Sequence, residues 1–370
     1  MKKSLVYDTL KDSLLKGRLL PGAKLPSEPE LARQLKVGRW TLREALKQLE
    51  DEGYLVRVKA QGTYIKEREI PLEEKVISML VPFPDFLNQN ISDPVFLDYV
   101  NSFYGAVRAV SEVGWRIQTI TYSRTNSQDD IDWQALEFLQ KDSRVIIFKH
   151  WYHKIFDILS KRGVRCGIFL DVDTDMHFPW DEFLRQNIVC YTPYNLVFGN
   201  AIRRLYEQGC KSFLLAGIYL DDAYNSRARI YSSVMRALDL PAEMLDLGNQ
   251  HDSQDALPLL KHRLSSRKYD AVLLDVPAIL RHTLRDYYQE LGVPETTRLL
   301  LHFDQPLFEF HKPSLSAFRI NTGWAGYQLA KKLMNPIWKP EAFHTTMEFM
   351  DRESTKSVGV TDEVSTHHKP

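Results

Sequence analysis

The sequence predicts a small α+β domain of short helices and a β-hairpin, followed by a larger α/β domain with parallel sheets in two lobes. Three observations lead to this prediction. Two amphipathic helical segments and a hairpin pattern fill residues 20–66. From residue 76 onward, strand-like apolar runs alternate with helical segments. The chain has 370 residues, 44% of them hydrophobic, so it is long enough for two or three domains with large cores.

The first short helix is expected to begin at Ser27, which precedes an apolar-periodic segment. Glu30 follows three residues later, so the two residues form the pattern of a capping box. Pro29 lies in the first turn, where its missing N–H does no harm. Apolar side chains up to Leu35 form the buried side of this helix, which should end just before Gly38.

A second helix is expected from about residue 39 to residue 51, ended by Gly53. Its apolar residues recur at i, i+3, i+4 and i+7 and form one buried stripe: Leu42, Ala45, Leu46 and Leu49. Arg39, Arg43 and Lys47 recur at every fourth residue on another face. Cations near a helix start oppose the macrodipole, which suggests an anionic partner. The alternative is an ordinary solvated face.

A hairpin follows this second helix directly. Residues 54–58 and 63–66 alternate as two strands around Ala60, Gln61 and Gly62. Two short helices followed by a basic hairpin are typical of a winged helix-turn-helix, whose second helix enters the major groove of duplex DNA. The charge distribution agrees with this interpretation: residues 1–70 hold 15 Lys and Arg against 10 Asp and Glu, whereas the other 300 residues hold 33 against 38.

Residues 4–66 resemble the gluconate-repressor-type (GntR) family of bacterial regulators. The LPSE-x-ELA string, the R-x-T-x-R-x-AL-x-x-LE-x-EG string and the QGT turn occur in that family's order and spacing. The resemblance implies that Arg39 and Arg43 read guanines in the major groove. It also implies that Thr41 holds phosphate and that Gly62 lets the wing tip enter the minor groove. The remaining DNA-binding residues expected from this match are Ser27, Lys47, Gln61 and Thr63.

Two residues depart from the family's pattern. Pro29 stands where many members have a DNA-contacting arginine, and Gly38 stands where a serine or threonine usually caps the recognition helix. These departures leave the expected binding mode unchanged and leave the operator sequence open.

The larger domain is expected from residue 76 to residue 356, after a charged linker at residues 69–75 and before a disordered tail at 357–370. Its strand-like runs are nearly continuous in apolar or β-branched residues, as in parallel sheets covered on both faces. These runs are residues 76–81, 115–122, 144–149, 164–170, 188–191, 212–218, 271–275 and 298–304. The main helical segments between them are residues 94–114, 133–139, 155–159, 196–206 and 284–291. Repeated β-α units of this total length exceed one core, so two lobes are expected.

Aromatic and carboxylate side chains gather where these strands end. Ligands of parallel sheets bind beyond the carboxyl ends of the strands, and rings with carboxylates suit a sugar. The candidate ligand-binding residues chosen on this basis are His150, Trp151, Tyr191, Asn195, Asp275 and Asp304. Helix caps are the alternative roles for Tyr191, Asn195 and Asp275, and for Asp304 the alternative is capping a helix or turn.

Residues 75–355 resemble the periplasmic-binding-protein-like effector domain of lactose- and galactose-type (LacI/GalR) repressors. The strings that carry the resemblance include NLVFGNAIRRLYEQGCKSFLLAG (195–217), SRARIYSSVMRAL (226–238) and LLLHFDQP (299–306). The resemblance implies that Asp304 and Arg229 bind sugar, with Arg227 as the second choice for the arginine. A surface ion pair is the equal alternative for Arg229. Leu274 stands where a ligand-contacting asparagine is common, so the identity of the ligand stays open.

The expected function is a sequence-specific transcriptional regulator, a repressor, which binds duplex DNA as a homodimer and is controlled by a small carbohydrate between two lobes. The alternative is a regulator that responds to a nucleoside, a uronate or another metabolite, with corepressor or activator logic. A transport receptor is disfavoured by the DNA-binding segment. An enzyme is disfavoured because no nucleophile elbow, P-loop, HExxH or GxGxxG motif occurs.

No run of 18 apolar residues exists and the first ten residues lack an apolar signal core, so a cytoplasmic location without membrane contact is expected. Cys166, Cys190 and Cys210 form no CxxC pair and are expected to be free thiols. His150 and His153 have no acidic or cysteine ligand beside them in the sequence. Neither a metal nor a cofactor is therefore expected.

Overall fold

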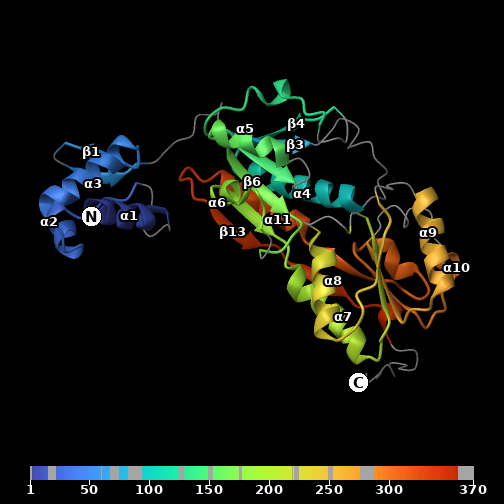
Figure 1. The fold of residues 1–370 in the computed structure, drawn as a ribbon. Coiled ribbons are helices and arrows are strands. Elements are labelled where there is room, and N and C mark those ends of the chain that lie inside the picture. The colour runs from blue at the N-terminus through green and yellow to red at the C-terminus, as the bar shows by residue number, and fades with distance from the viewer. Residues whose placement is uncertain are drawn as a thin grey trace, which may run out of the picture. The chain divides into compact units, whose positions relative to one another are not determined.

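The computed structural model describes residues 2–15, 22–59, 61–66, 75–81, 94–124, 129–148, 153–174, 177–218, 220, 225–248, 253–275 and 287–356. The chain divides into two compact units, one built mainly from residues 1–76 and the other mainly from residues 77–370 (Figure 1). The expected tail, and all of the expected linker except Lys75, lie outside the described residues, so both stay predictions. Among the described helices, none has the length and apolarity needed to cross a bilayer.

The first unit is a winged helix-turn-helix, as predicted. Its elements are α1 (Lys2–Leu15), α2 (Glu28–Gln34), α3 (Arg39–Asp51), β1 (Leu55–Val58) and β2 (Gly62–Ile65). The two strands pair antiparallel, with Leu55 opposite Ile65 and Val58 opposite Gly62. One apolar core joins all five elements, and its buried members include Val6, Leu31, Leu46, Leu55 and Ile65. Helix α1 was not predicted from periodicity.

The start of α2 agrees with the sequence, but the way it is capped does not. Ser27 is the N-cap residue of α2, and its side chain makes no capping hydrogen bond. The capping box expected from Ser27 and Glu30 is therefore not formed. Pro29 offers one physical reason, because it removes the N2 backbone N–H, one of the two donors that an N-cap oxygen can bind. The preset φ of Pro29 still favours a helix at this point.

The second unit contains two six-stranded sheets, which confirms the prediction of a two-lobed α/β domain with parallel sheets. The first sheet has the order β13-β7-β6-β5-β3-β4 and the second has the order β14-β12-β11-β10-β8-β9. The strands of the first sheet are β3 (Val76–Val81), β4 (Arg116–Thr121), β5 (Arg144–Phe148), β6 (Arg165–Leu170), β7 (Ile188–Tyr191) and β13 (Glu341–His344). Those of the second are β8 (Phe213–Gly217), β9 (Met244–Asp246), β10 (Ala271–Asp275), β11 (Arg298–Leu301), β12 (Ser316–Ile320) and β14 (Met347–Met350).

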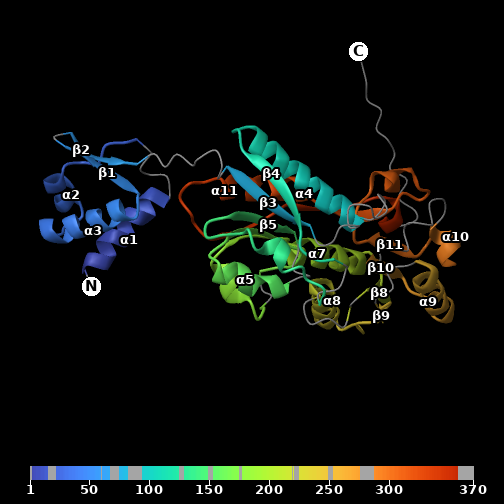
Figure 2. The same cartoon turned by 90° about the horizontal axis from the view of Figure 1, so that it is seen from above.

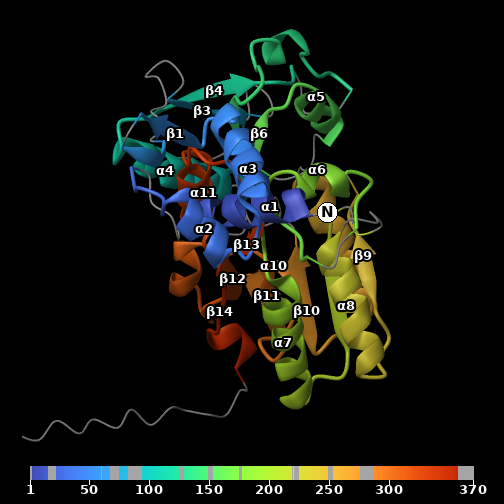
Figure 3. The ribbon, with the colours of Figure 1, turned by 90° about the vertical axis from the view of Figure 1, so that its left-hand side faces the viewer.

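Helices cover both sheets. Those beside the first sheet are α4 (Pro94–Ser111), α5 (Phe156–Lys161), α6 (Asp181–Arg185) and α11 (Thr322–Leu333). Those beside the second sheet are α7 (Tyr194–Glu207), α8 (Ser226–Ala237), α9 (Ser253–Ser266) and α10 (Tyr287–Leu291). Figure 2 shows α4 beside β3 and β4, and Figure 3 shows α7 and α8 running alongside the second sheet. Each sheet has its own buried core, so each lobe is stabilised separately.

The chain passes between the two sheets three times along its described strands: from β7 to β8, from β12 to β13, and from β13 to β14. The last two passages return strands from the far end of the sequence to the two sheets. Strand β13 pairs parallel to β7, whereas β14 pairs antiparallel to β12. The two lobes are therefore each assembled from discontinuous segments of sequence.

All eight strand-like runs predicted from the sequence lie on strands, but four described strands, β9, β12, β13 and β14, were not predicted. Strands β13 and β14 lie at the outer ends of their sheets. No side chain of β13 and only the first side chain of β14 is fully buried, so their sequences mix polar and apolar residues instead of forming continuous apolar runs. Strand β9 has only three residues, and β12 is interrupted by the polar Arg319. The helix expected at residues 133–139 is reduced to a single 3-10 turn at Gln134–Leu136, because so short a segment gains few backbone hydrogen bonds.

Helices α4 and α11 touch through their backbones. A Cβ atom added to Gly105 would lie 1.9 Å from the carbonyl oxygen of Gly323, and one added to Gly326 would lie 2.0 Å from the carbonyl oxygen of Ser102. Both distances are far inside van der Waals contact with atoms of fixed backbone. Only glycine allows the two helices to approach this closely at these positions.

We expect Gly326→Ala to lower the free energy of unfolding of the second unit by about 1–3 kcal/mol or more, since the new methyl group forces the helices apart. Gly323→Ala is the matched control on the same helix. Its Cβ would meet its nearest neighbour, the carbonyl oxygen of Asn101, at an ordinary 3.5 Å. Urea unfolding of the full chain, followed by circular dichroism, measures both. Equal unfolding midpoints for the two variants would contradict the proposed backbone contact.

Candidate nucleic-acid interface and effector site

Helix α3 carries the cationic face that the sequence predicts. Arg39, Arg43 and Lys47 are all exposed. The opposite side of the helix forms the core of the first unit, where each of the four apolar side chains, Leu42, Ala45, Leu46 and Leu49, is at most 1% exposed. The cationic face is thus not packed inside this unit, and it presents guanidinium and ammonium groups to solvent.

Arg43 is held from the neighbouring helix. Its Nε donates to the Oε2 of Glu28 at the start of α2, at 2.6 Å, while the arginine side chain remains 64% exposed. A bidentate contact to O6 and N7 of guanine can be made by the two terminal nitrogens, so the pairing at Nε leaves that contact possible. The carboxylate therefore reduces the freedom of the guanidinium. Sequence reasoning did not name Glu28 as a functional residue, although it lies in the LPSE string.

The tip of the wing depends on a left-handed backbone. Gly62 has a φ of +118°, which side-chain-bearing residues rarely adopt. A Cβ added at Gly62 would also meet Cε of Lys24 at 2.9 Å. Gln61 beside it is exposed and Thr63 is half-buried. Any substitution of Gly62 would strain the turn that presents this pair, which agrees with the role that the family resemblance assigns to it.

The other two predicted DNA-binding residues stand at helix starts. Ser27 is exposed at the N-terminus of α2, and Thr41 is half-buried in the first turn of α3. Gly38, the N-cap of α3, has no side chain to satisfy the first backbone N–H groups, and that first turn contains no acidic residue. The start of α3 therefore carries no negative charge of its own to oppose a phosphate.

In the second unit, Arg227 bridges the two sheets. Its Nε donates to Oδ2 of Asp275 at 2.6 Å, and its Nη1 lies 3.5 Å from Oδ2 of Asp171. Asp275 ends β10 of the second sheet, whereas Asp171 directly follows β6 of the first. All three side chains are largely buried, because their exposed fractions are 17%, 4% and 8%. Buried charges of this kind persist only when they are paired.

Two rings complete this network. The hydroxyl of Tyr194 donates to Asp171, and His302 Nε2 lies 3.0 Å from the same hydroxyl. The rings of Tyr194 and His302 stack with their centroids 5.4 Å apart. Burial, with the negative charge of Asp171 added to it, raises the pKa of Tyr194 well above its ordinary value, so the phenol remains protonated. Its hydrogen bond to Asp171 is therefore permanent over the ordinary pH range.

The charge of Arg227 is equally fixed. Burial by itself would lower the pKa of this guanidinium, but Asp275, Tyr194 and Asp171 more than offset that effect and raise it. The network, defined by Asp171, Tyr194, Arg227, Asp275 and His302, therefore combines a permanent cation with carboxylates and stacked rings. Carboxylates accept hydrogen bonds from hydroxyl groups and a guanidinium donates them, so this set of groups can bind a polyhydroxylated molecule.

The structure selects Arg227 and not Arg229 from the two arginines considered. Residues two apart on a helix point about 200° apart, so only one of them can face the network. Arg229 is exposed on the other side of α8, where it lines a separate surface hollow with Ser232 and Met244. Helix geometry therefore places Arg227, the second choice of the sequence analysis, in the network, and the ligand role expected of Arg229 stays a prediction. Asp275 joins the network as one of the predicted residues.

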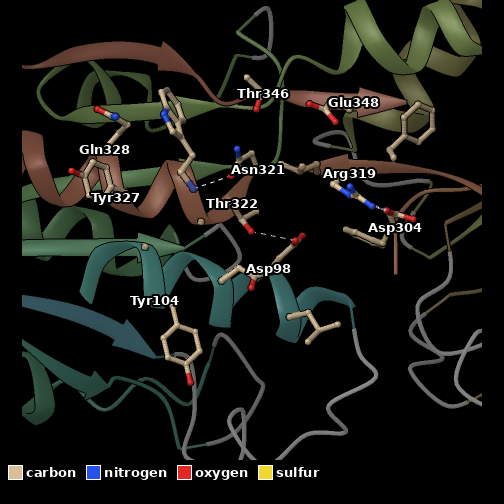
Figure 4. A pocket seen from close by; sticks show the side chains of 18 of the residues that line it. Asp98, Tyr104, Asp304, Arg319, Asn321, Thr322, Tyr327, Gln328, Thr346 and Glu348 are labelled. Atoms are coloured by element: carbon tan, nitrogen blue, oxygen red, sulfur yellow. Dashed lines mark hydrogen bonds and ion pairs between the residues drawn. The ribbon is translucent and has the colours of Figure 1, made fainter. Parts of the chain in front are cut away.

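Asp304 does not join this network. Its side chain is 3% exposed, and its two oxygens pair with Arg319 at 2.6 Å and Arg352 at 2.7 Å. It lies instead at a groove of about 1110 Å³ that is lined by α4, α11, β12 and β14 (Figure 4). His302, two residues earlier on the same strand end, takes part in the network. The structure thus does not bring Asp304 and Asp275 together in one network, and the ligand role of Asp304 stays a prediction.

Two of the remaining predicted ligand residues, Tyr191 and Asn195, are described and lie outside the network. Tyr191 ends β7 half-buried, where burial raises the pKa of its hydroxyl and its ring lies 6.1 Å from that of His344. Asn195 is exposed, and its backbone N–H donates to Asp173 Oδ2 at 2.7 Å, so Asp173 caps the start of α7. His150 and Trp151 lie outside the described residues.

No group of three or more potential metal ligands occurs in the part of the chain that the structure describes. Cys166, Cys190 and Cys210 are buried free thiols. Burial raises the pKa of the Cys190 thiol to about 12, so this side chain remains protonated and unreactive at neutral pH.

Family models match most of the first unit and part of the second. Residues 2–65 match the family of bacterial regulatory proteins described as the gntR family. Residues 202–355 match the periplasmic binding protein-like domain. The second match contains Arg227, Asp275 and His302, while Asp171 and Tyr194 precede it.

Individual proteins agree with these domain matches. The arabinose metabolism transcriptional repressor of Geobacillus stearothermophilus is 31% identical over 127 residues, which cover 34% of this chain and 31% of that protein. The matched part is thus less than a third of that relative's length. A LacI family transcriptional regulator from Bifidobacterium animalis subsp. lactis has a similar structure, with a TM-score of 0.58 at 14% identity, covering 77% of this chain and 98% of that one. A complex of the transcriptional regulator CelR with cellobiose gives a TM-score of 0.56 at 15% identity, covering 89% and 100% of the two chains.

We expect Arg227→Ala to lower the free energy of unfolding by about 3–5 kcal/mol, because it leaves Asp171 and Asp275 buried without their cation. Arg229→Ala, on the same helix, should change it by less than about 0.5 kcal/mol. Urea unfolding of the full-length variants measures both values. If both substitutions had equally small effects, Arg227 would not be a bridge between the sheets.

Proposed function

We propose that this chain, with its gntR-family DNA-binding domain and its periplasmic-binding-protein-like domain, is a transcriptional repressor whose affinity for duplex DNA is controlled by a small carbohydrate. The observation that carries the DNA-binding part is the exposed cationic face of α3, in a unit that matches the gntR family over residues 2–65. The domain matches and relatives belong to regulators and not to enzymes.

In this proposal α3 enters the major groove, and Arg39 and Arg43 read guanines. Glu28 holds the guanidinium of Arg43 in one direction, and this reduces the side-chain entropy that is lost on binding. Lys47 and Thr41 contribute contacts to phosphate, and the Gly62 turn of the wing reaches the minor groove. Ser27, Gln61 and Thr63 are the further residues assigned to this interface.

The effector site of the proposal is the buried network around Arg227. Support comes from its composition and from the regulator CelR, which has a similar fold and forms a complex with cellobiose. The network joins Asp171 of one lobe to Arg227 and Asp275 of the other. The hydroxyl groups of a sugar that bound there would replace some of the hydrogen bonds now made between Arg227 and the two carboxylates. The relative position of the two lobes would then depend on the ligand.

A homodimer would connect this movement to the DNA. Two winged helices related by a twofold axis fit an operator with two half-sites, and a shift of the lobes would change the distance between them. The ligand acts only through its preference for one arrangement of the lobes, and coupling of about 1–3 kcal/mol is typical. Release of DNA on sugar binding is the form of control that we propose.

Arg43→Ala should weaken binding to a duplex selected by the wild-type protein by about 1–3 kcal/mol and relax the preference for guanine at one base pair. Glu28→Gln should weaken the same duplex less, since it removes only the group that orients Arg43. Fluorescence anisotropy with a labelled duplex measures both affinities, and Arg229→Ala serves as the control. Unchanged affinity of Arg43→Ala would remove α3 as the recognition helix.

Binding to the same duplex should also fall steeply as salt is raised, because each phosphate contact releases condensed counterions. The slope of log affinity against log salt should become shallower by about one for Lys47→Ala if Lys47 contacts phosphate. A slope near zero for the wild-type protein would contradict an electrostatic contact to DNA.

A panel of pentoses, hexoses, disaccharides, uronates and nucleosides should contain a ligand that raises the melting temperature of the full chain, because a ligand that binds only the folded state stabilises it by mass action. The Asp275→Asn variant should lose this shift, whereas Arg229→Ala should retain it. A ligand whose shift survives in Asp275→Asn would have to bind at a different place.

A further inference from the structure

Trp40 is the most exposed large hydrophobic side chain among the described residues of the first unit. Its exposed fraction is 72%, although the unit has a closed apolar core. It is the single tryptophan among the first 76 residues of the sequence. Within the described residues its ring makes no aromatic, cation–π or hydrogen-bond contact. No contact between the described residues of the unit therefore accounts for an indole at this position.

The position of Trp40 on α3 points it directly away from the core. Successive residues of a helix are about 100° apart, so Trp40 lies about 180° from the fully buried Leu49. The same spacing places it about 20° from Lys47 and about 60° from Arg43. The indole thus stands in the first turn of the helix at one edge of the cationic face, next to Lys47.

The surroundings of Trp40 favour nucleic acid over a protein as its partner. Arg39 precedes it, Arg43 and Lys47 share its face, and the first turn of α3 contains no acidic residue. An apolar group beside exposed cations at the start of a helix suits a surface that is anionic outside and apolar within, and the acidic residues of α3 nearest to it, Glu44 and Asp51, lie one turn or more further along the helix. The major groove is such a surface, because phosphates border it and each thymine presents a C5-methyl group at its floor.

We propose that Trp40 is a specificity-determining residue that packs its indole against a thymine C5-methyl group in the major groove, next to the base pair read by Arg43. This inference rests on the DNA-binding function proposed above. It adds a base contact that arginines cannot supply, since a guanidinium recognises hydrogen-bond acceptors and an indole recognises a methyl group. Burial of the exposed ring on DNA is the driving force.

The experiment uses full-length wild-type protein, Trp40→Ala, and the control Trp133→Ala, which removes a tryptophan of the second unit that is 46% exposed. Each protein selects duplexes from a random library. The selected wild-type duplex is then resynthesised with uracil in place of each thymine in turn, which removes one methyl group and keeps the base pairing. Anisotropy titrations give the affinities, and circular dichroism verifies that each variant is folded.

We expect Trp40→Ala to lose the preference for thymine at one position of each half-site and to bind the wild-type duplex about tenfold more weakly or worse. Uracil at that position should weaken the wild-type protein about fourfold, the equivalent of one buried methyl group, and should have no effect on Trp40→Ala. Trp133→Ala should behave as the wild-type protein does.

Two results would overturn the contact while leaving the DNA-binding function intact. If Trp40→Ala selects the same sequence with the same affinity, the indole does not touch DNA. If it loses affinity equally for all duplexes and no uracil distinguishes it from the wild type, the indole lies on the sugar–phosphate backbone. Failure of the wild-type protein to enrich any duplex would instead contradict the DNA-binding function itself, and the Trp40 contact with it.

Discussion

The arrangement of the second unit depends on one guanidinium that is removed from water between carboxylates of both sheets. Arg227 has a partner on β10 and another after β6, so neither lobe alone satisfies it. An ion pair this deeply buried is not an efficient source of stability, because desolvation offsets most of the attraction. Its value lies in selecting one relative position of two separately stable cores. In the proposed function, the same property would let a ligand with comparable hydrogen bonds take the place of part of this ion pair.

The first unit also positions an arginine by pairing it with a carboxylate, but there the pair is exposed and loses less hydration. Arg43 is exposed, yet Glu28 on the adjacent helix fixes it at 2.6 Å. Exposed pairs contribute little to folding. Here the pair instead orders the Arg43 side chain, which in the proposed function contacts DNA. In both units, then, a carboxylate from one element determines where an arginine of another element can act.

The fold was largely predictable from the sequence because its core elements bury whole faces. The stripe of α3 and the apolar runs of β5, β6, β8 and β10 are buried throughout, and their sequences show it directly. Strands β13 and β14 were not predicted, because the sequences of these edge strands mix polar and apolar residues. The network around Arg227 was less predictable. Arg227 and Arg229 differ by two positions in the same string, and only the rotation of α8 decides between them. Asp304 stands at the expected position in the sequence, but its carboxylate is paired with Arg319 and Arg352. These partners lie 15 and 48 residues away, so no local sequence pattern reveals them.

The order of strands in the first sheet has a consequence for the chain during its synthesis. Strand β7 ends at Tyr191, but the strand that covers its edge, β13, begins only at Glu341. While the ribosome translates the intervening residues, the first lobe exposes the unpaired backbone of β7 to other nascent chains. Open strand edges of this kind promote aggregation. Strand β13 therefore completes the edge of the first sheet late in synthesis. A truncation that removed β13 would leave β7, in the lobe that was made first, unpaired on that side.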